Sequence, residues 1–139
     1  MLDSAVMIYA LGGDHPYRQP CRLLMGAARA GELQAETTAL AVQEVLHQRA
    51  RRTGDRQRAA AVSRDLATVL VVHELLGSDL RRAIELFAES SALDAADACH
   101  AAIALDRGIG TIISPDRAFD AVPGLRRLDP VAASALMTT

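Results

Sequence analysis

Helical segments alternate along this chain with short apolar segments, and this alternation constrains the fold more than any other feature. Apolar residues recur at helical spacing between Cys21 and Ala28. The continuous run Thr68-Val69-Leu70-Val71-Val72 instead has the composition of a strand buried on both faces of a parallel sheet. The pattern predicts an α/β fold in which helices cover both faces of a parallel sheet.

The turn and cap residues between these segments predict where the elements begin and end. The expected helices span residues 5–11, 17–30, 40–52, 56–66, 79–88 and 94–107, and the expected strands residues 2–3, 33–38, 68–72, 111–113 and 125–128. With 139 residues the chain fits one ordinary domain. We expect residues 1–130 to form this domain and residues 131–139 to be a mobile C-terminal tail.

Composition indicates a soluble, cytoplasmic protein. The longest apolar stretch, residues 66–72, is far too short to span a bilayer. No basic segment precedes an apolar run at the N-terminus, as a secretory signal would require. Cys21 and Cys99 lie far apart without CxxC spacing, which argues against a zinc site or a disulfide framework. We expect both cysteines to be reduced core residues, although an oxidising compartment could pair them.

Charge is spread unevenly along the chain. The formal net charge of −2 does not by itself indicate a polyanionic partner, but arginines crowd one short stretch. They are Arg49, Arg51, Arg52, Arg56 and Arg58. The chain contains no lysine, and the planar guanidinium of arginine suits phosphate. A solvated helix end and an RNA-binding groove both fit this cluster.

Four acidic residues interrupt segments that otherwise have core composition: Asp3, Glu44, Asp97 and Asp116. Buried carboxylates are costly unless they are paired or bind a cation. Ligands of open parallel sheets bind beyond the carboxyl ends of the strands, where Asp3 and Asp116 would project and where helices could bring the other two. Because neighbouring carboxylates raise one another's pKa, a hard cation would stabilise such a cluster. Oxygen ligands predict Mg²⁺ or Mn²⁺.

The two acids in the N-terminal half of the chain also have structural explanations. Asp3 could cap a helix that Ser4 opens, and this role is as compatible with the sequence as catalysis. Glu44 could be a solvated helix residue that pairs with a nearby arginine.

The two later acids have structural alternatives as well. Asp94 and Asp97 have capping-box spacing, so both could merely satisfy backbone donors at a helix start, and we expect Asp94 to act only in this way. Asp116 follows Ser114-Pro115 in a sequence typical of a turn, where aspartate is common for conformational reasons.

The histidines and cysteines do not indicate a different chemistry, and the common nucleotide-binding and zinc-protease motifs are absent. His100 and Cys99 are adjacent, so on a helix they would diverge by about 100° and could not form a Cys-His pair. His47 lies three residues after Glu44, and we expect both histidines to be structural. The absence of GxGxxG, GxxxxGK and HExxH motifs argues against dinucleotide binding, P-loop nucleotide binding and zinc proteolysis.

The segments around the four acids resemble, in order and spacing, those of PIN-domain proteins, above all the VapC-type toxins of prokaryotic toxin–antitoxin pairs. The resemblance extends almost over the whole chain, through Pro130. Its motifs are Leu2-Asp3-Ser4-Ala5-Val6, Val42-Gln43-Glu44-Val45-Leu46-His47, Asp97-Ala98-Cys99-His100-Ala101-Ala102 and Thr111-Ile112-Ile113-Ser114-Pro115-Asp116-Arg117-Ala118-Phe119-Asp120.

The resemblance implies a three-layer α/β/α sandwich and a Mg²⁺- or Mn²⁺-dependent endoribonuclease that cleaves RNA phosphodiesters with metal-activated water. It also implies inhibition by a VapB-like antitoxin and assembly as a homodimer. The implied catalytic and metal-binding quartet is Asp3, Glu44, Asp97 and Asp116, with second-tier residues Ser4, Ser114, Asp94 and Asp120. Family members usually have more apolar residues before the first acid, so we expect a first strand that is truncated or whose start is misassigned.

Two other functions are compatible with such a fold. A catalytically silent PIN-like binding module would keep the architecture for partner recognition alone. A phospho-acceptor receiver-like domain also gathers carboxylates at strand ends, but it relies on a lysine that this chain lacks. Aromatic residues make up only 3% of the chain. We therefore expect arginine–phosphate contacts and RNA shape, rather than base stacking, to govern RNA recognition.

Overall fold

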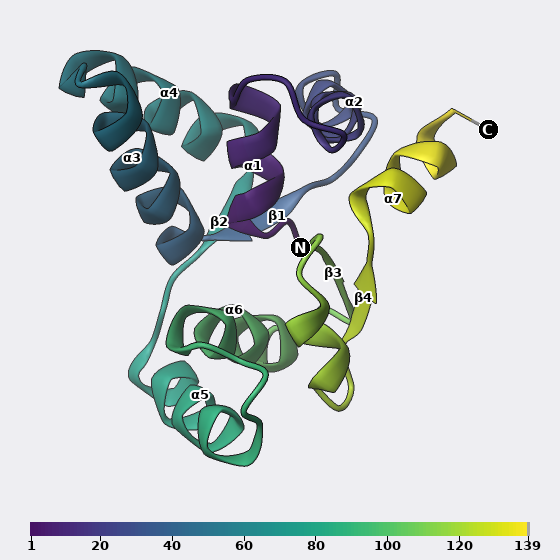
Figure 1. Ribbon diagram of the computed structural model, residues 1–139. Coiled ribbons are helices and arrows are strands. Elements are labelled where there is room, and N and C mark those ends of the chain that lie inside the picture. The colour runs from purple at the N-terminus through teal and green to yellow at the C-terminus, as the bar shows by residue number, and fades with distance from the viewer. Residues whose placement is uncertain (139) are drawn as a thin grey trace.

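The computed structural model describes residues 1–138 of the chain, in which helices alternate with short strands (Figure 1). The helices are α1 (Ser4–Leu11), α2 (Arg18–Arg29), α3 (Ala39–Thr53), α4 (Arg56–Val69), α5 (Gly77–Glu89), α6 (Ala95–Asp106), the 3-10 helix η1 (Arg117–Ala121) and α7 (Pro130–Met137). The strands are β1 (Glu36–Thr38), β2 (Val71–His73), β3 (Thr111–Ile113) and β4 (Arg126–Leu128). The predicted α/β class is confirmed.

Residues 1–3 join two pairs of parallel strands. β1 pairs with β2, and β3 pairs with β4. Between the pairs, the Leu2 amide donates to the Glu36 carbonyl at 2.7 Å. The Ile113 amide donates to Met1 O at 2.8 Å, and the Asp3 amide donates to Ile113 O at 3.1 Å. The strands therefore run in the order β2, β1, residues 1–3, β3, β4. The truncated first strand expected from the sequence is a single parallel bridge between Leu2 and Ile113.

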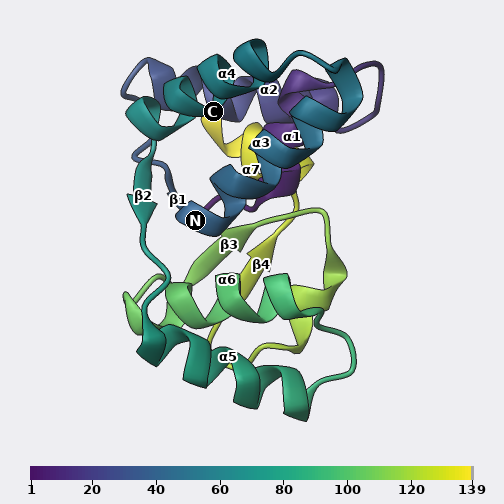
Figure 2. The same ribbon diagram turned by 90° about the vertical axis from the view of Figure 1, so that its left-hand side faces the viewer.

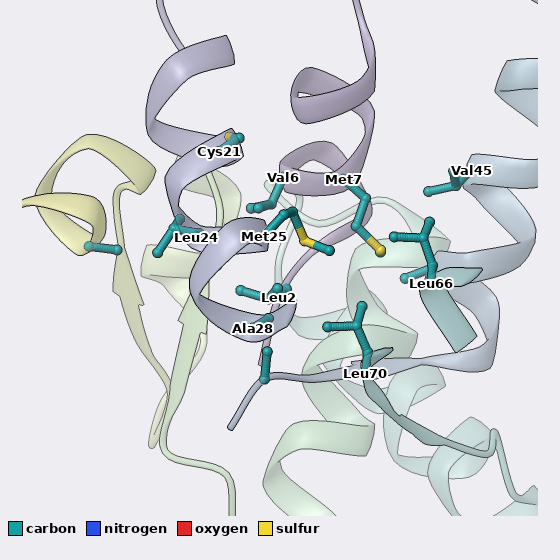
Figure 3. Close-up of a cluster of buried hydrophobic side chains, with 13 residues drawn as sticks. Leu2, Val6, Met7, Cys21, Leu24, Met25, Ala28, Val45, Leu66 and Leu70 are labelled. Carbon is teal, nitrogen blue, oxygen red and sulfur yellow. The ribbon is translucent and has the colours of Figure 1, made fainter. Parts of the chain in front are cut away.

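Helices lie on both sides of these strands. In Figure 2, α1 to α4 and α7 lie above the strands, whereas α5 and α6 lie below. The larger core is on the upper side, where Leu2 packs with apolar residues of α1, α2 and α4 such as Val6, Leu24 and Leu66 (Figure 3). A second core joins Ile112 of β3 to α6 and η1. This layered arrangement is the expected α/β/α sandwich.

The strand predicted at residues 68–72 was placed too early and in the wrong environment. Thr68 and Val69 belong to α4, because buried Ala59, Ser63 and Leu66 continue a helical spacing toward them. The strand itself is β2, at the edge of the order, and Val71 is 54% exposed. A strand with only one strand neighbour need not be covered on both faces.

The predicted C-terminal tail is also partly wrong, because residues 130–137 form α7. Asp129 accepts a hydrogen bond from the Val131 amide at 2.8 Å, and Pro130 occupies the first helical position. Ala133 and Ser134 are buried, and α7 packs on α2. Asp129 and Pro130 therefore start a helix directly after β4. Thr139, the last residue of the predicted tail, lies outside the described residues.

Both cysteines, Cys21 and Cys99, are free and buried, as expected. Burial raises the pKa of the Cys21 thiol to about 12. None of the helices within residues 1–138 combines the length and apolar character that crossing a bilayer requires.

A buried ion pair ties α5 to the end of α6. The Asp79 side chain is fully buried, and its two oxygens accept from Arg107 Nη1 at 2.5 Å and Nη2 at 2.9 Å. Asp79 Oδ2 also accepts from the Leu76 amide at 2.8 Å, at the start of α5. The Arg107 guanidinium holds the pKa of Asp79 well below its usual range. One carboxylate therefore caps α5 and anchors the residue that follows α6.

Arg107→Met should lower the free energy of unfolding by about 2–4 kcal/mol at pH 7, because Asp79 would keep its buried charge without its cationic partner. Since the folded-state pKa of Asp79 is depressed, the stabilisation is present above about pH 4 and is lost as the pH falls further. Urea denaturation at pH 7 and pH 3 measures both effects. Arg29→Met, which removes a half-exposed pair with Asp65, should cost less than about 1 kcal/mol. Equal losses in the two variants would contradict the role given to Asp79.

Candidate metal centre

The four predicted acidic residues approach one another from four different segments. Asp3 follows the central bridge and precedes α1, and Glu44 lies on α3. Asp97 lies in the first turn of α6, and Asp116 lies between β3 and η1. The charges of Asp3 and Asp116 both act on Asp97, and the charge of Glu44 acts on Asp3. All four therefore lie on the same side of the molecule, as a shared site requires.

Asp3 is the buried centre of this group. Its side chain is only 6% exposed, and Oδ2 accepts a hydrogen bond from the Ser114 hydroxyl at 2.7 Å. Although Asp3 stands at the N-cap position of α1, its side chain makes no capping hydrogen bond. Burial raises the pKa of Asp3, and the Ser114 hydroxyl only partly offsets that effect. The helix-capping explanation is therefore wrong for this carboxylate.

Glu44 is held from both sides. Oε2 accepts from the Ser4 hydroxyl at 3.0 Å, and Oε1 lies 2.7 Å from His100 Nε2. His100 Nδ1 lies 2.9 Å from the Thr38 hydroxyl, so the ring is fixed at both nitrogens. Glu44 is thus oriented by a histidine and a serine, and the expectation that it pairs with an arginine is wrong. Ser4 lies between Glu44 and Asp3, whose Oδ1 is 3.5 Å from the same hydroxyl.

His100 is a site residue that sequence reasoning underrated. We expected it to be structural, and it is buried, with 2% of its surface exposed. Burial lowers its pKa, but the Glu44 bond and the charges of Asp3 and Asp97 outweigh that effect and leave the pKa above the usual value. The available signal was its spacing, because His100 lies three residues after Asp97 and so on the same helix face.

Asp97 carries the least compensated charge of the group. Burial, followed by the charges of Asp94, Asp116 and Asp3, raises its pKa to about 7. A hydrogen bond from the Asp94 amide to the Asp97 carboxylate offsets only part of this rise. Asp94 also caps α6, because its Oδ1 accepts from the Asp97 amide at 2.7 Å, as expected. A bound cation would keep the Asp97 carboxylate ionised.

Asp116 and Asp120 have different surroundings. Asp116 Oδ1 accepts from the Ala118 amide at 2.9 Å, so the predicted turn role is confirmed, and the Asp116 amide donates to Ser114 Oγ at 3.0 Å. Asp116 remains exposed, with its second oxygen outside this turn bond. Asp120 is engaged by Arg127, whose Nε donates to Oδ1 at 2.9 Å. Asp116 is therefore better placed than Asp120 to bind a ligand.

The arginine cluster, residues 49–58, lies at the corner between α3 and α4. Arg51, Arg52, Arg56 and Arg58 are exposed, and Arg49 is partly exposed. Across residues 1–138, no hydrogen bond or ion pair joins this cluster to the four acids. This placement is that of a solvated helix end, next to a pocket of about 430 Å³ lined by Leu46, His47, Arg56 and neighbouring residues.

The chemistry of the acidic group fits a hard divalent cation. All its donors are oxygens, and burial and mutual repulsion raise the pKa of Asp3 and Asp97, which an ion would reverse. Within residues 1–138, no three His, Cys, Asp or Glu side chains are already arranged around a single point. Mg²⁺ does not need such a cage, because it keeps several waters and is usually held by one or two carboxylates.

Fold and site together define a small α/β protein with carboxylates gathered beyond the ends of parallel strands. The family model for the PIN domain matches residues 1–125. The chain therefore belongs to the PIN-domain family, as the motifs indicated.

Individual relatives agree with this assignment. The chain is 36% identical over 137 residues to Ribonuclease VapC7 of Mycobacterium tuberculosis, covering 96% of this chain and 92% of that protein. It is 30% identical over 131 residues to Ribonuclease VapC13 of the same organism, covering 92% and 98%. Among solved structures, a chain of VapBC2 from Rickettsia felis bound to a promoter DNA fragment has a TM-score of 0.69 at 14% identity. That match covers 93% of this chain and 96% of the other, and supports the fold.

Asp97→Asn should stabilise the metal-free protein at pH 8 by about 1–2 kcal/mol. A folded-state pKa of about 7 means that ionisation of Asp97 opposes folding. The wild-type protein therefore has its full stability below pH 4, where Asp97 is protonated, and loses part of it between pH 4 and pH 7. The full shift would correspond to about 4 kcal/mol, which partial exposure reduces.

Urea denaturation in the presence of a chelator measures this difference. It should be large at pH 8 and close to zero at pH 4. Asp120→Asn is the matched control, because it removes a paired carboxylate and should not stabilise the protein. A wild-type protein more stable than Asp97→Asn at pH 8 without metal would show that Asp97 is not electrostatically strained.

Proposed function

We propose that the chain is a Mg²⁺- or Mn²⁺-dependent endoribonuclease and the toxin of a VapBC-type toxin–antitoxin pair. The observation that carries the proposal is the convergence of Asp3, Glu44, Asp97 and Asp116 in a chain of the PIN-domain family. Relatives over nearly the whole length are named VapC ribonucleases. PIN-domain VapC nucleases generally depend on a divalent metal, and the oxygen-only donors favour Mg²⁺ or Mn²⁺ over softer ions.

The carboxylates of the quartet would hold the ion, which would activate a water molecule and offset charge on the phosphate under attack. Asp3 is fixed by the Ser114 hydroxyl and lies deepest. Glu44 is aimed by Ser4 and His100, so it presents its carboxylate in one orientation. Asp97 and Asp116 lie nearer to solvent, where RNA would enter. Without a cation, the four negative charges would repel the RNA backbone.

Two other functions receive less support. A silent PIN-like module does not explain Asp97, because an ionised carboxylate at this position destabilises the fold and only a function such as metal binding would maintain it. A phospho-acceptor receiver domain is disfavoured because the chain contains no lysine.

RNA cleavage should disappear with EDTA and return with Mn²⁺, and Glu44→Gln should lower cleavage by about 100-fold or more while the protein remains folded. Gel analysis of a labelled RNA measures the activity, circular dichroism the fold, and isothermal titration with Mn²⁺ the metal binding. Asp120→Asn should behave as the wild type, because Arg127 already engages that carboxylate.

The titration also separates the nuclease from a silent module. A folded wild-type protein that binds no Mn²⁺ and cleaves no RNA would support the binding module and exclude the nuclease. Full activity of Glu44→Gln would contradict the assigned metal site even if the protein were a nuclease.

The partner proposed for this toxin is a VapB-like antitoxin. The structural relative is a VapBC complex, and a protein that covers the acidic group would block RNA. Co-expression with the product of the adjacent small gene should give a complex without RNase activity, from which denaturation and refolding of the toxin alone restore cleavage.

We also propose that the chain forms a homodimer through an apolar face of α5. Leu80, Ile84 and Phe87 are 46–55% exposed along one side of this helix and border an apolar pocket of about 150 Å³ against α6. In an antiparallel pair of α5 helices, Arg81 of each copy would lie near Glu85 of the other. Self-complementary charge therefore flanks an apolar stripe, which a second copy would cover.

Ile84→Glu should convert a dimer into a monomer, because the charge would be buried at the centre of this face. Light scattering coupled to size-exclusion chromatography measures the mass. Leu23→Glu, at an exposed apolar residue of α2, should leave the dimer intact. A monomeric wild-type protein, or an Ile84→Glu dimer, would contradict this interface.

A further inference from the structure

Both tyrosines of the chain meet His15 at the connection between α1 and α2. The ring centroids of Tyr9 and His15 are 4.3 Å apart with 25° between the planes, and those of His15 and Tyr17 are 5.7 Å apart with 18° between the planes. Tyr9 and Tyr17 are 5.5 Å apart and tilted by 41°. The three rings, called here the aromatic triad, form one compact stack although aromatic residues are rare in this sequence.

Hydrogen bonds orient two rings of the triad, and all three rings reach solvent. His15 is exposed, and its Nδ1 accepts a hydrogen bond from the Tyr17 amide at 3.1 Å, which fixes the ring. Tyr17 donates its hydroxyl proton to Asp129 Oδ2 at 2.7 Å, and both tyrosines are only partly buried. A pre-oriented aromatic surface can stack on a flat ligand with little loss of side-chain entropy.

A chain of contacts leads from the triad to the acidic group. Asp129, the partner of Tyr17, lies 3.9 Å from Arg127 Nη1. The same Arg127 nitrogen donates to the Ser114 carbonyl at 3.0 Å, and the Ser114 hydroxyl donates to Asp3. In Figure 2 the α1–α2 connection and the segment after β3 lie on the same, right-hand side of the molecule. The triad and the acidic group are therefore linked through Asp129, Arg127 and Ser114, on the same side of the molecule.

An arginine next to the triad lacks a full set of partners. The Nε of Arg18 is buried and has no hydrogen-bond partner within residues 1–138. The guanidinium of Arg18 lies 3.8 Å from the exposed Asp14, and this is a weak surface pair. Arg18 begins α2 directly after Tyr17. A guanidinium beside an aromatic stack offers a phosphate contact next to a base-stacking surface.

We propose that Tyr9, His15, Tyr17 and Arg18 form a nucleotide subsite that stacks one unpaired base of single-stranded RNA and contacts its phosphate. The inference rests on the proposed nuclease function and deepens it by naming residues outside the acidic group that would bind the RNA. Single-stranded RNA is recognised by stacking of splayed bases on aromatic and arginine side chains. The low aromatic content led us to expect that arginine–phosphate contacts and RNA shape, rather than base stacking, govern recognition, and the proposed subsite adds one stacking position to those contacts.

Intrinsic fluorescence tests this subsite directly, because the chain has no tryptophan and its only two tyrosines belong to the triad. With Mg²⁺ present and mixing fast enough to precede cleavage, a short single-stranded RNA of mixed sequence should quench tyrosine emission after correction for absorption. A fully abasic oligonucleotide of equal length and charge should not quench. Equal responses to the two probes would overturn base stacking.

Steady-state cleavage supplies a second, independent measurement. His15→Ala should raise KM for single-stranded RNA by about fivefold or more, with kcat and Mn²⁺ affinity unchanged. His15→Phe keeps a flat ring and should retain a nearly wild-type KM. If His15 were only structural, His15→Ala would change kcat or folding as well as KM. Unchanged KM in His15→Ala, with intact folding by circular dichroism, would overturn the subsite.

The two proposals fail in different ways. If the protein binds no Mn²⁺ and cleaves no RNA, the nuclease function is wrong, whatever the fluorescence shows. If Mn²⁺-dependent cleavage is present but tyrosine emission is insensitive to bases, the subsite alone is wrong.

Discussion

The hydrogen bonds of residues 1–3 are the interaction on which the rest of the structure depends. Leu2 and Ile113 form the bridge that joins β1 and β2 to β3 and β4, and Leu2 also contributes to the larger core. The next residue, Asp3, leaves the sheet at this junction with its backbone already fixed. The carboxylate is therefore positioned by the same bonds that unite the two halves of the sheet, and Ser114, one residue beyond β3, completes its surroundings.

The acidic group illustrates how a protein can keep like charges together before an ion arrives. Hydroxyl groups and one histidine satisfy the inner carboxylates Asp3 and Glu44. The hydrogen bond from the Asp94 amide does not offset burial and the neighbouring charges at Asp97, and its pKa rises to about 7. The site thus divides into an inner part that is oriented by side-chain hydrogen bonds and an outer part whose charge is poorly compensated. This division suits a cation that must still exchange ligands with water and phosphate.

Much of the fold and the acidic quartet could be predicted from sequence, because periodicity, caps and the position of acids after strands are local signals. The sequence did not show whether Thr68 and Val69 end a helix or begin a strand. β-branched residues favour strands, but contacts with the core can hold them in a helix. The role of His100 depends on Glu44 and Thr38, which are distant in sequence and meet only in the folded chain. The triad likewise depends on the loop that returns Tyr17 toward Tyr9.

The quartet is drawn from both sides of the layered architecture. Asp3 and Glu44 are tied to the helices above the strands in Figure 2, and Asp97 lies on α6 below them. A divalent ion bound among these residues would link the two helical layers across the sheet. Local opening of either layer would then separate the ligands and release the ion, so the chemistry would stop well before the chain as a whole lost its native structure.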